Sequence, residues 1–118
     1  MGLIKVKFGI FNPLAPKGSV EWEGIVDTGA MYSVIPRKIL EKLEVKPLER
    51  RKFRAFGEYI ERDIGEVGIE LMGRRRTVTV IMGEEEDITV LGVTALEAFG
   101  LEVDPVKGTL REAELLLL

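Results

Sequence analysis

Apolar and polar residues alternate along most of the chain with the period of two that is typical of half-buried β-strands. Near the start, Ile4, Val6, Phe8 and Ile10 are separated by lysines and a glycine. Comparable runs predict further strands at residues 20–26, 33–35, 67–71, 77–82 and 88–91.

Two short segments have the spacing of a helix instead. The first is predicted over residues 36–43, with Pro36 in its first turn. The second begins near Thr94, which is expected to form a capping box with Glu97, and it ends near Gly100.

The chain of 118 residues is large enough for one hydrophobic core, and 46% of its residues are hydrophobic. No internal repeat or low-complexity linker divides it. We therefore expect a single domain over residues 1–118, of the all-β class with one or two short helices. The net charge of −3 argues against a general nucleic-acid-binding protein.

The chain contains neither Cys nor His. This excludes disulfides, thiolate metal sites, the usual zinc sites and catalysis by Ser-His or Cys-His pairs. No metal or other cofactor is expected. Catalysis would have to come from carboxylates, Lys, Tyr or an unassisted hydroxyl group.

The start of the chain does not resemble a signal peptide, because Lys5 and Lys7 interrupt the stretch that would be its apolar centre. No segment approaches the roughly 20 apolar residues of a membrane span. We therefore expect a cytoplasmic protein without a membrane partner. The absence of Gln, the single Asn and the abundance of Glu, Lys and Arg indicate a thermophilic source.

The most unusual stretch is Asp27-Thr28-Gly29-Ala30, which follows the apolar pair Ile25-Val26. A carboxyl group at the end of an apolar strand is costly to bury without partners. Thr28 and Gly29 supply a hydroxyl group, backbone N–H groups and a turn open to positive φ, which such a carboxylate needs. Taken alone, the tripeptide is equally compatible with an ordinary turn, because Asp and Gly are common turn residues.

The surroundings of the motif make it more specific. Ser33-Val34-Ile35-Pro36 follows it, and a second apolar pair precedes a glycine in Val90-Leu91-Gly92. In this order the segments resemble the catalytic loop of retropepsin-like aspartic proteases, the retroviral-type single-domain branch, and the strand beside that loop. The resemblance covers roughly residues 20–110. It implies a closed-barrel-like acid protease fold with one lobe per chain.

The resemblance also assigns roles to residues. It implies that Asp27 is catalytic, that Thr28 forms hydroxyl-to-backbone bonds between subunits, and that Gly29 offers N–H groups to the carboxylates. Residues 55–60 lie where the family has its flap, a β-hairpin that folds over the substrate. The expected substrate contacts are Ala30, Phe56, Gly57, Tyr59, Ile60, Val90, Leu91 and Gly92.

The chain departs from the family pattern at three places. Met31 stands where retroviral enzymes usually carry Asp, so an ion pair made by that acid is in doubt. Val93-Thr94 replaces the usual Arg followed by Asp or Asn, which removes an ion pair between subunits. The flap segment is also poorer in glycine than is usual.

Asp27 is the one acid of the chain in such a motif. Peptide hydrolysis by this chemistry needs two neighbouring carboxyl groups that share one proton. A single copy per chain therefore predicts a symmetric homodimer in which the two Asp27 side chains meet at the two-fold axis. The expected partner, besides a second copy, is a peptide or protein substrate.

Three functions stay open. The first is an aspartic endopeptidase that is active as a homodimer. The second is a catalytically inactive retropepsin-like module that binds peptides or dimerises, which Met31 and the glycine-poor flap favour. The third is an unrelated small β-barrel in which Asp27 lies in an ordinary turn.

The chain ends in four leucines, Leu115 to Leu118, after a predicted hairpin over residues 101–110. An exposed apolar end is an aggregation hazard. We expect this run to add a strand to a sheet shared between subunits, or else to be a tail outside the fold.

Overall fold

The computed structural model describes residues 3–117, so Leu118 of the leucine run lies outside the described residues. The elements are β1 (Lys5–Asn12), β2 (Ala15–Val26), β3 (Ser33–Pro36), α1 (Arg37–Lys42), β4 (Glu49–Ala55), β5 (Glu58–Leu71), β6 (Arg74–Gly83), β7 (Val90–Leu91), α2 (Val93–Phe99), β8 (Leu101–Asp104) and β9 (Thr109–Glu112). The mainly β class that the alternation predicted is confirmed.

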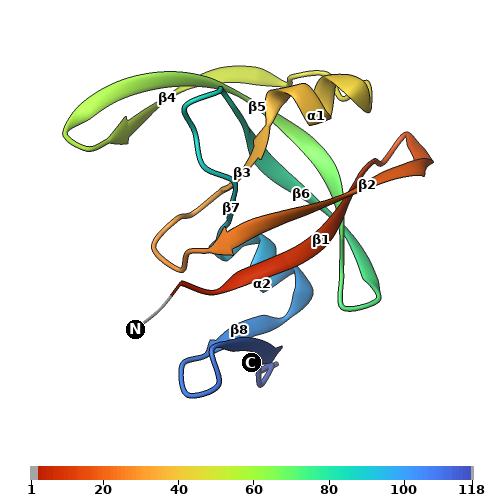
Figure 1. Ribbon diagram of the computed structural model, residues 1–118, viewed down its shortest axis with the longest axis vertical. Coiled ribbons are helices and arrows are strands. Elements are labelled where there is room, and N and C mark those ends of the chain that lie inside the picture. Colours follow the sequence, from red (N-terminus) through yellow and green to blue (C-terminus); the bar gives the residue numbers. More distant parts are fainter. Residues whose placement is uncertain (1–2, 118) are drawn as a thin grey trace.

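Seven strands form one sheet that curls back on itself (Figure 1). The strand order is β1-β2-β7-β3-β6-β5-β4, and β1 also pairs with β5. This extra antiparallel pairing runs from Gly9 opposite Glu70 to Phe11 opposite Gly68, and it closes the sheet into a small barrel. Strand β4 is the last in the order and forms a hairpin with the first half of β5.

The inward positions of the strands fill the barrel with apolar side chains, each of which contributes about 1.5–3 kcal/mol when fully buried. Both short helices add to this core through their buried residues. Within residues 3–117, no helix is long and apolar enough to cross a membrane. The largest apolar side chains with no exposed surface are Ile10, Ile35, Leu40, Ile69, Met82 and Leu91.

The capping box predicted at Thr94 is wrong. Helix α2 begins at Val93, its N-cap is Gly92, and no side chain caps it. The Thr94 hydroxyl donates instead to the backbone carbonyl of Met31, 2.6 Å away. A contact between distant segments has therefore taken the hydroxyl group that a local cap would have used.

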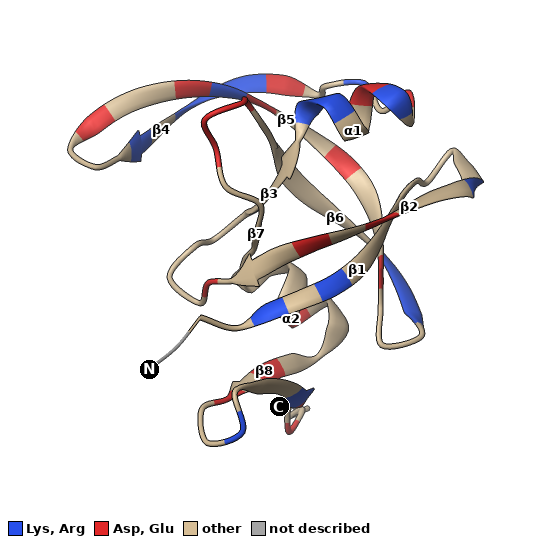
Figure 2. Ribbon diagram, in the orientation of Figure 1, with Lys and Arg blue, Asp and Glu red and all other residues tan. Residues whose placement is uncertain are grey.

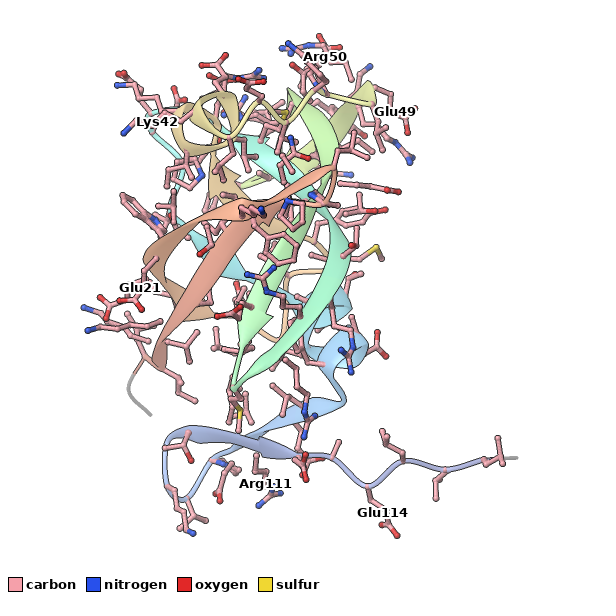
Figure 3. All side chains as sticks on the ribbon, turned by 90° about the vertical axis from the view of Figure 1, so that its right-hand side faces the viewer. Glu21, Lys42, Glu49, Arg50, Arg111 and Glu114 are labelled. Carbon is pink, nitrogen blue, oxygen red and sulfur yellow. The ribbon has the colours of Figure 1, made fainter. Side chains whose placement is uncertain are left out.

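Strands β8 and β9 form a separate two-stranded sheet below the barrel (Figure 3). Arg74 at the start of β6 attaches this hairpin, because it donates to the carbonyl of Phe99 at 3.2 Å and pairs with Glu112. The chain after β9 runs away from the barrel, with residues 115–117 exposed and outside any strand. A strand shared with a second subunit stays a prediction for this run.

Charged residues of both signs lie along α1 and the β4–β5 hairpin (Figure 2), and ion pairs connect the two. Arg37 of α1 donates to Asp63 of β5 at 2.7 Å and to Glu84 at 3.0 Å. Asp63 also accepts a hydrogen bond from Arg50 of β4 at 3.3 Å. The hydrogen bond from Arg37 lowers the pKa of Asp63 below its ordinary value, although partial burial opposes the shift.

A substitution at Gly68 tests whether the pairing of β1 with β5 closes the barrel, because the Phe11 ring lies directly over this glycine. A Cβ atom at this position would lie 2.2 Å from the ring. We expect Gly68→Ala to lower the free energy of unfolding by about 3 kcal/mol, since the ring must leave its site between β1 and β5. Urea unfolding measures this. Gly18→Ala is the control, because no atom lies within 4 Å of its added Cβ; equal losses in both variants would contradict the closure.

Low pH should destabilise the protein. The pKa of Asp63 is lowered by Arg37, that of Asp87 by Arg62, and that of Asp104 by the N–H group of Lys107. Carboxyl groups with a lowered pKa in the folded state stabilise it fully above the unfolded value of about 3.9, and this contribution is lost as the pH falls through the folded value.

We expect the melting temperature, followed by circular dichroism, to be constant from pH 7 to pH 5 and to fall below pH 4. Asp63→Asn should weaken this dependence on pH. A melting temperature that rises on acidification below pH 4 would show that these pairs do not contribute.

Candidate active site

Asp27 follows the last residue of β2 and begins a tight turn. Its N–H group donates to the carbonyl of Leu91 at 3.1 Å, which continues the parallel pairing of β2 with β7. Its carboxylate accepts a hydrogen bond from the N–H group of Gly29 at 2.8 Å, and its carbonyl accepts one from Ala30 at 3.2 Å. The turn therefore presents the carboxylate at the surface with one backbone donor already in place.

Asp27 differs from the other three aspartates in its charged neighbours. Asp63, Asp87 and Asp104 each pair with an arginine, whereas Asp27 pairs with no lysine or arginine within residues 3–117. Asp27 and Thr28 are both exposed in the single chain. Among the described residues, the hydrogen bond that its carboxylate accepts comes from the N–H group of Gly29.

Strand β7 and the start of α2 hold this turn from behind. The N–H groups of Val93 and Thr94 donate to the carbonyls of Ala30 at 2.8 Å and Met31 at 2.9 Å. The Thr94 hydroxyl adds a second bond to Met31. These contacts fix the backbone after Asp27 at a place where the Met31 side chain cannot form an ion pair.

Gly92 lies between this turn and β3, in a space that admits no side chain. An added Cβ atom would lie 2.7 Å from the carbonyl oxygen of Tyr32 and 2.8 Å from that of Ala30. The N–H group of Gly92 donates to the Ser33 hydroxyl at 2.9 Å, and Ser33 is fully buried. The sequence analysis placed Ser33 in the segment after the motif but gave it no role, and the signal that could have indicated one is a small hydroxyl residue at the start of an otherwise apolar strand.

Leu91 and Val90 have different surroundings. Leu91 has no exposed surface and belongs to the core, so its side chain is not available to a substrate. Val90 is half-buried, pairs with Ile25 of β2 and stands opposite Val34 of β3.

The hairpin of residues 49–64, which we call the flap, has its tip at Phe56 and Gly57. Both tip residues have positive φ, 52° and 79°. Phe56 is fully exposed although such a φ is unfavourable for its bulky side chain. In Figure 1 the tip lies on the same side of the barrel as the loop after β2, which contains Asp27.

The pairing register separates the two aromatic and apolar positions that follow the tip. Ile60 stands opposite Phe53, and the Phe53 ring meets the Tyr32 ring edge-on at 6.3 Å. This face of the flap, which we call its inner face, therefore turns toward the segment that follows Asp27. Tyr59 stands opposite Arg54 on the other face.

Basic side chains occupy the face of the flap on which Tyr59 lies. The Lys52 ammonium and the Arg54 guanidinium each lie 5.6 Å from the centre of the Tyr59 ring. Tyr59 and Ile60, both expected to contact the substrate, therefore lie on different faces of the flap. Phe53 is the residue that lies beside Ile60.

A pocket of about 360 Å³ opens beside the Asp27 turn, and we call it the side pocket. Ile25, the next-to-last residue of β2 and two positions before Asp27, lines it. Its other lining residues are Lys5, Trp22, Glu23, Gly24, Ile88 and Thr89.

Comparison with known proteins gives matches of structure rather than sequence. No protein-family profile matches the chain, and no curated protein matches it. The retroviral protease-like domain of Ddi1 from Leishmania major matches with a TM-score of 0.66 and 17% identity, over 98% of this chain and 91% of that one.

Two viral proteases match in the same way. The EIAV protease, solved with the inhibitor HBY-793, has a TM-score of 0.59 and 20% identity, over 98% of this chain and 94% of that one. The Simian Foamy Virus (mac) protease has a TM-score of 0.57 and 17% identity, over 81% of this chain and 92% of that one. The chain therefore has the fold of the retropepsin-like aspartic proteases.

Proposed function

We propose that this protein is an aspartic endopeptidase that is active as a homodimer, in which each chain contributes one Asp27. The observation that carries this proposal is the Asp27 turn, where a carboxylate that pairs with no lysine or arginine of residues 3–117 is held at the surface by backbone hydrogen bonds. The retropepsin-like fold supports it. So does the single copy of the motif, which leaves one chain with half of the carboxyl groups that the chemistry needs.

In the dimer, the two Asp27 carboxyl groups share one proton, because two like charges about 3 Å apart cannot both remain ionised. The ionised carboxylate takes a proton from a bound water molecule, whose oxygen attacks the carbonyl carbon of the scissile peptide. The neutral carboxyl group donates its proton to the carbonyl oxygen. The carboxyl group that took the proton from water then gives it to the nitrogen of the tetrahedral intermediate, and the C–N bond breaks with the amine as leaving group.

Each neighbouring residue has a role in this scheme. The N–H group of Gly29 stabilises the ionised carboxylate. Gly29 can approach this closely because it has no side chain, whereas an added Cβ atom would lie only 3.2 Å from Asp27 Oδ1. The exposed Thr28 hydroxyl bonds to the partner's backbone. Ala30 and Gly92 give the substrate backbone a surface with small side chains or none.

A peptide lies in extended conformation between the Asp27 turn and the inner face of the flap, paired as an added strand. The flap contributes Gly57, Ile60 and Phe53, with Phe56 at its tip. Val90 and the side pocket beside it add apolar surface. This lining favours peptides with hydrophobic residues next to the scissile bond, and a peptide-library profile with a preference for charged residues there would refute that specificity.

The central test is Asp27→Asn, which keeps the size of the side chain and removes its charge. We expect hydrolysis of unstructured peptides to fall by about 10⁴-fold or more, because an amide can neither accept the proton of water nor share a proton. The melting temperature and the sedimentation coefficient should stay those of the wild type, since the carboxylate has no ion pair to lose.

Asp104→Asn is the matched control, because Asp104 is the last residue of β8 and pairs with Arg111 instead. This variant should lose stability at neutral pH and retain its specific activity at a temperature where it is folded. Equal hydrolysis by Asp27→Asn and the wild type would contradict the proposed function.

A further inference from the structure

An ion pair beneath the flap connects it to the wall of the side pocket. Arg62 of β5 donates from Nε to Asp87 Oδ2 at 2.7 Å and from Nη2 to Oδ1 at 3.1 Å. The two side chains are only 14% and 21% exposed, which makes this the most buried of the ion pairs in the part of the chain that the structure describes. A bidentate, partly buried ion pair of this kind fixes both the distance between the two side chains and their relative orientation.

Arg62 belongs to the inner face of the flap. It lies two residues after Ile60, so both side chains project from the same face of β5. Any rotation of the flap about its base therefore moves the guanidinium relative to Asp87.

Asp87 also organises its own segment, residues 84–89, which joins β6 to β7. Its Oδ2 atom accepts a hydrogen bond from the N–H group of Glu84 at 2.8 Å, and its own N–H group donates to the Glu84 carbonyl at 3.0 Å. Arg62 thus holds the residue on which this turn depends.

The residues that follow Asp87 form one wall of the side pocket. Ile88 is 65% exposed and lines it. The Thr89 hydroxyl accepts a hydrogen bond from Trp22 Nε1 at 3.1 Å, and the Thr89 carbonyl accepts one from the N–H group of Ile25 at 3.1 Å. Only Ile88 therefore separates Asp87, which Arg62 of the flap holds, from Thr89, whose carbonyl binds the N–H group of Ile25.

We propose that Arg62 and Asp87 are positioning residues that couple the flap to the side pocket, so that closure of the flap sets the position of Ile88 against a bound side chain. The occupant is a large apolar side chain of the substrate peptide, because Trp22, Ile25 and Ile88 all line the pocket with apolar surface. The identity of this occupant rests on the proposed function. The coupling itself rests on the contacts of the single chain.

The coupling is tested by amide hydrogen exchange, measured by NMR on Arg62→Gln without any substrate. We expect exchange at Glu84 and Asp87 to accelerate about tenfold or more. The amides of Ile25 and Asp27, which bond to the far end of the same segment and to β7, should accelerate as well. Acceleration confined to Glu84 and Asp87 would overturn the coupling, because the pocket would then be independent of the pair.

Arg75→Gln is the matched control, since Arg75 makes an equally short 2.7 Å bond to Glu70 at the other end of the β5–β6 hairpin. It should leave these four amides unchanged, and an equal effect in both variants would overturn the coupling. Arg62→Lys keeps the charge but not the two-pronged bond and should give a smaller acceleration. Asp87→Asn combined with Arg62→Gln should accelerate exchange at Ile25 no more than either change alone.

Kinetics test the occupant separately. If Asp27-dependent hydrolysis is present, Arg62→Gln should raise KM about tenfold for peptides with Phe next to the scissile bond and leave KM unchanged for those with Ala there. An equal change for both peptides would overturn the assignment of the pocket. If hydrolysis is absent, the proposed function fails while the exchange experiment still decides the coupling.

Discussion

The backbone of Gly92 passes so close to the carbonyls of Ala30 and Tyr32 that a single methyl group would force the segments apart. The position of Asp27 depends on this approach. Because Gly92 has no side chain, β7 lies between β2 and β3, and the N–H groups that follow it reach the carbonyls of the Asp27 turn. A buried Ser33 hydroxyl satisfies the N–H group of Gly92 itself, so the close approach leaves no buried donor unpaired.

This constraint explains how a turn at the surface is kept rigid without local charge pairs. The Thr94 hydroxyl and N–H group both bind the carbonyl of Met31, which fixes the backbone just after Ala30. Ion pairs are concentrated instead around the flap and the segment after β6. The Asp27 turn is thus held by backbone hydrogen bonds, whereas the flap and the segment after β6 are held by ion pairs.

Much of this arrangement could be predicted from the sequence. The alternation of apolar residues gave the strands, and an acid between an apolar pair and a glycine marked the turn that the structure shows at Asp27. These features are local, so neighbouring residues in the chain are sufficient to specify them.

Features that depend on distant partners could not be predicted in this way. As neighbours in one strand, Tyr59 and Ile60 must lie on opposite faces, but only the pairing with β4 and the contact of Phe53 with Tyr32 decide which of them turns toward the Asp27 turn. Leu91 looked like a substrate contact and lies in the core. Thr94 had the spacing of a helix cap, yet its hydroxyl binds a carbonyl 63 positions away. In each case a tertiary contact decided between two roles that the local sequence allowed equally.

The measurement that most directly tests whether two chains share one site is a subunit-mixing experiment. Wild-type protein and Asp27→Asn are mixed at constant total concentration, allowed to exchange subunits, and assayed for peptide hydrolysis. If each site needs both aspartates, activity falls with the square of the wild-type fraction, to about one quarter in an equal mixture. A decrease in direct proportion to the wild-type fraction would show that one chain is sufficient and would contradict a site built from two halves.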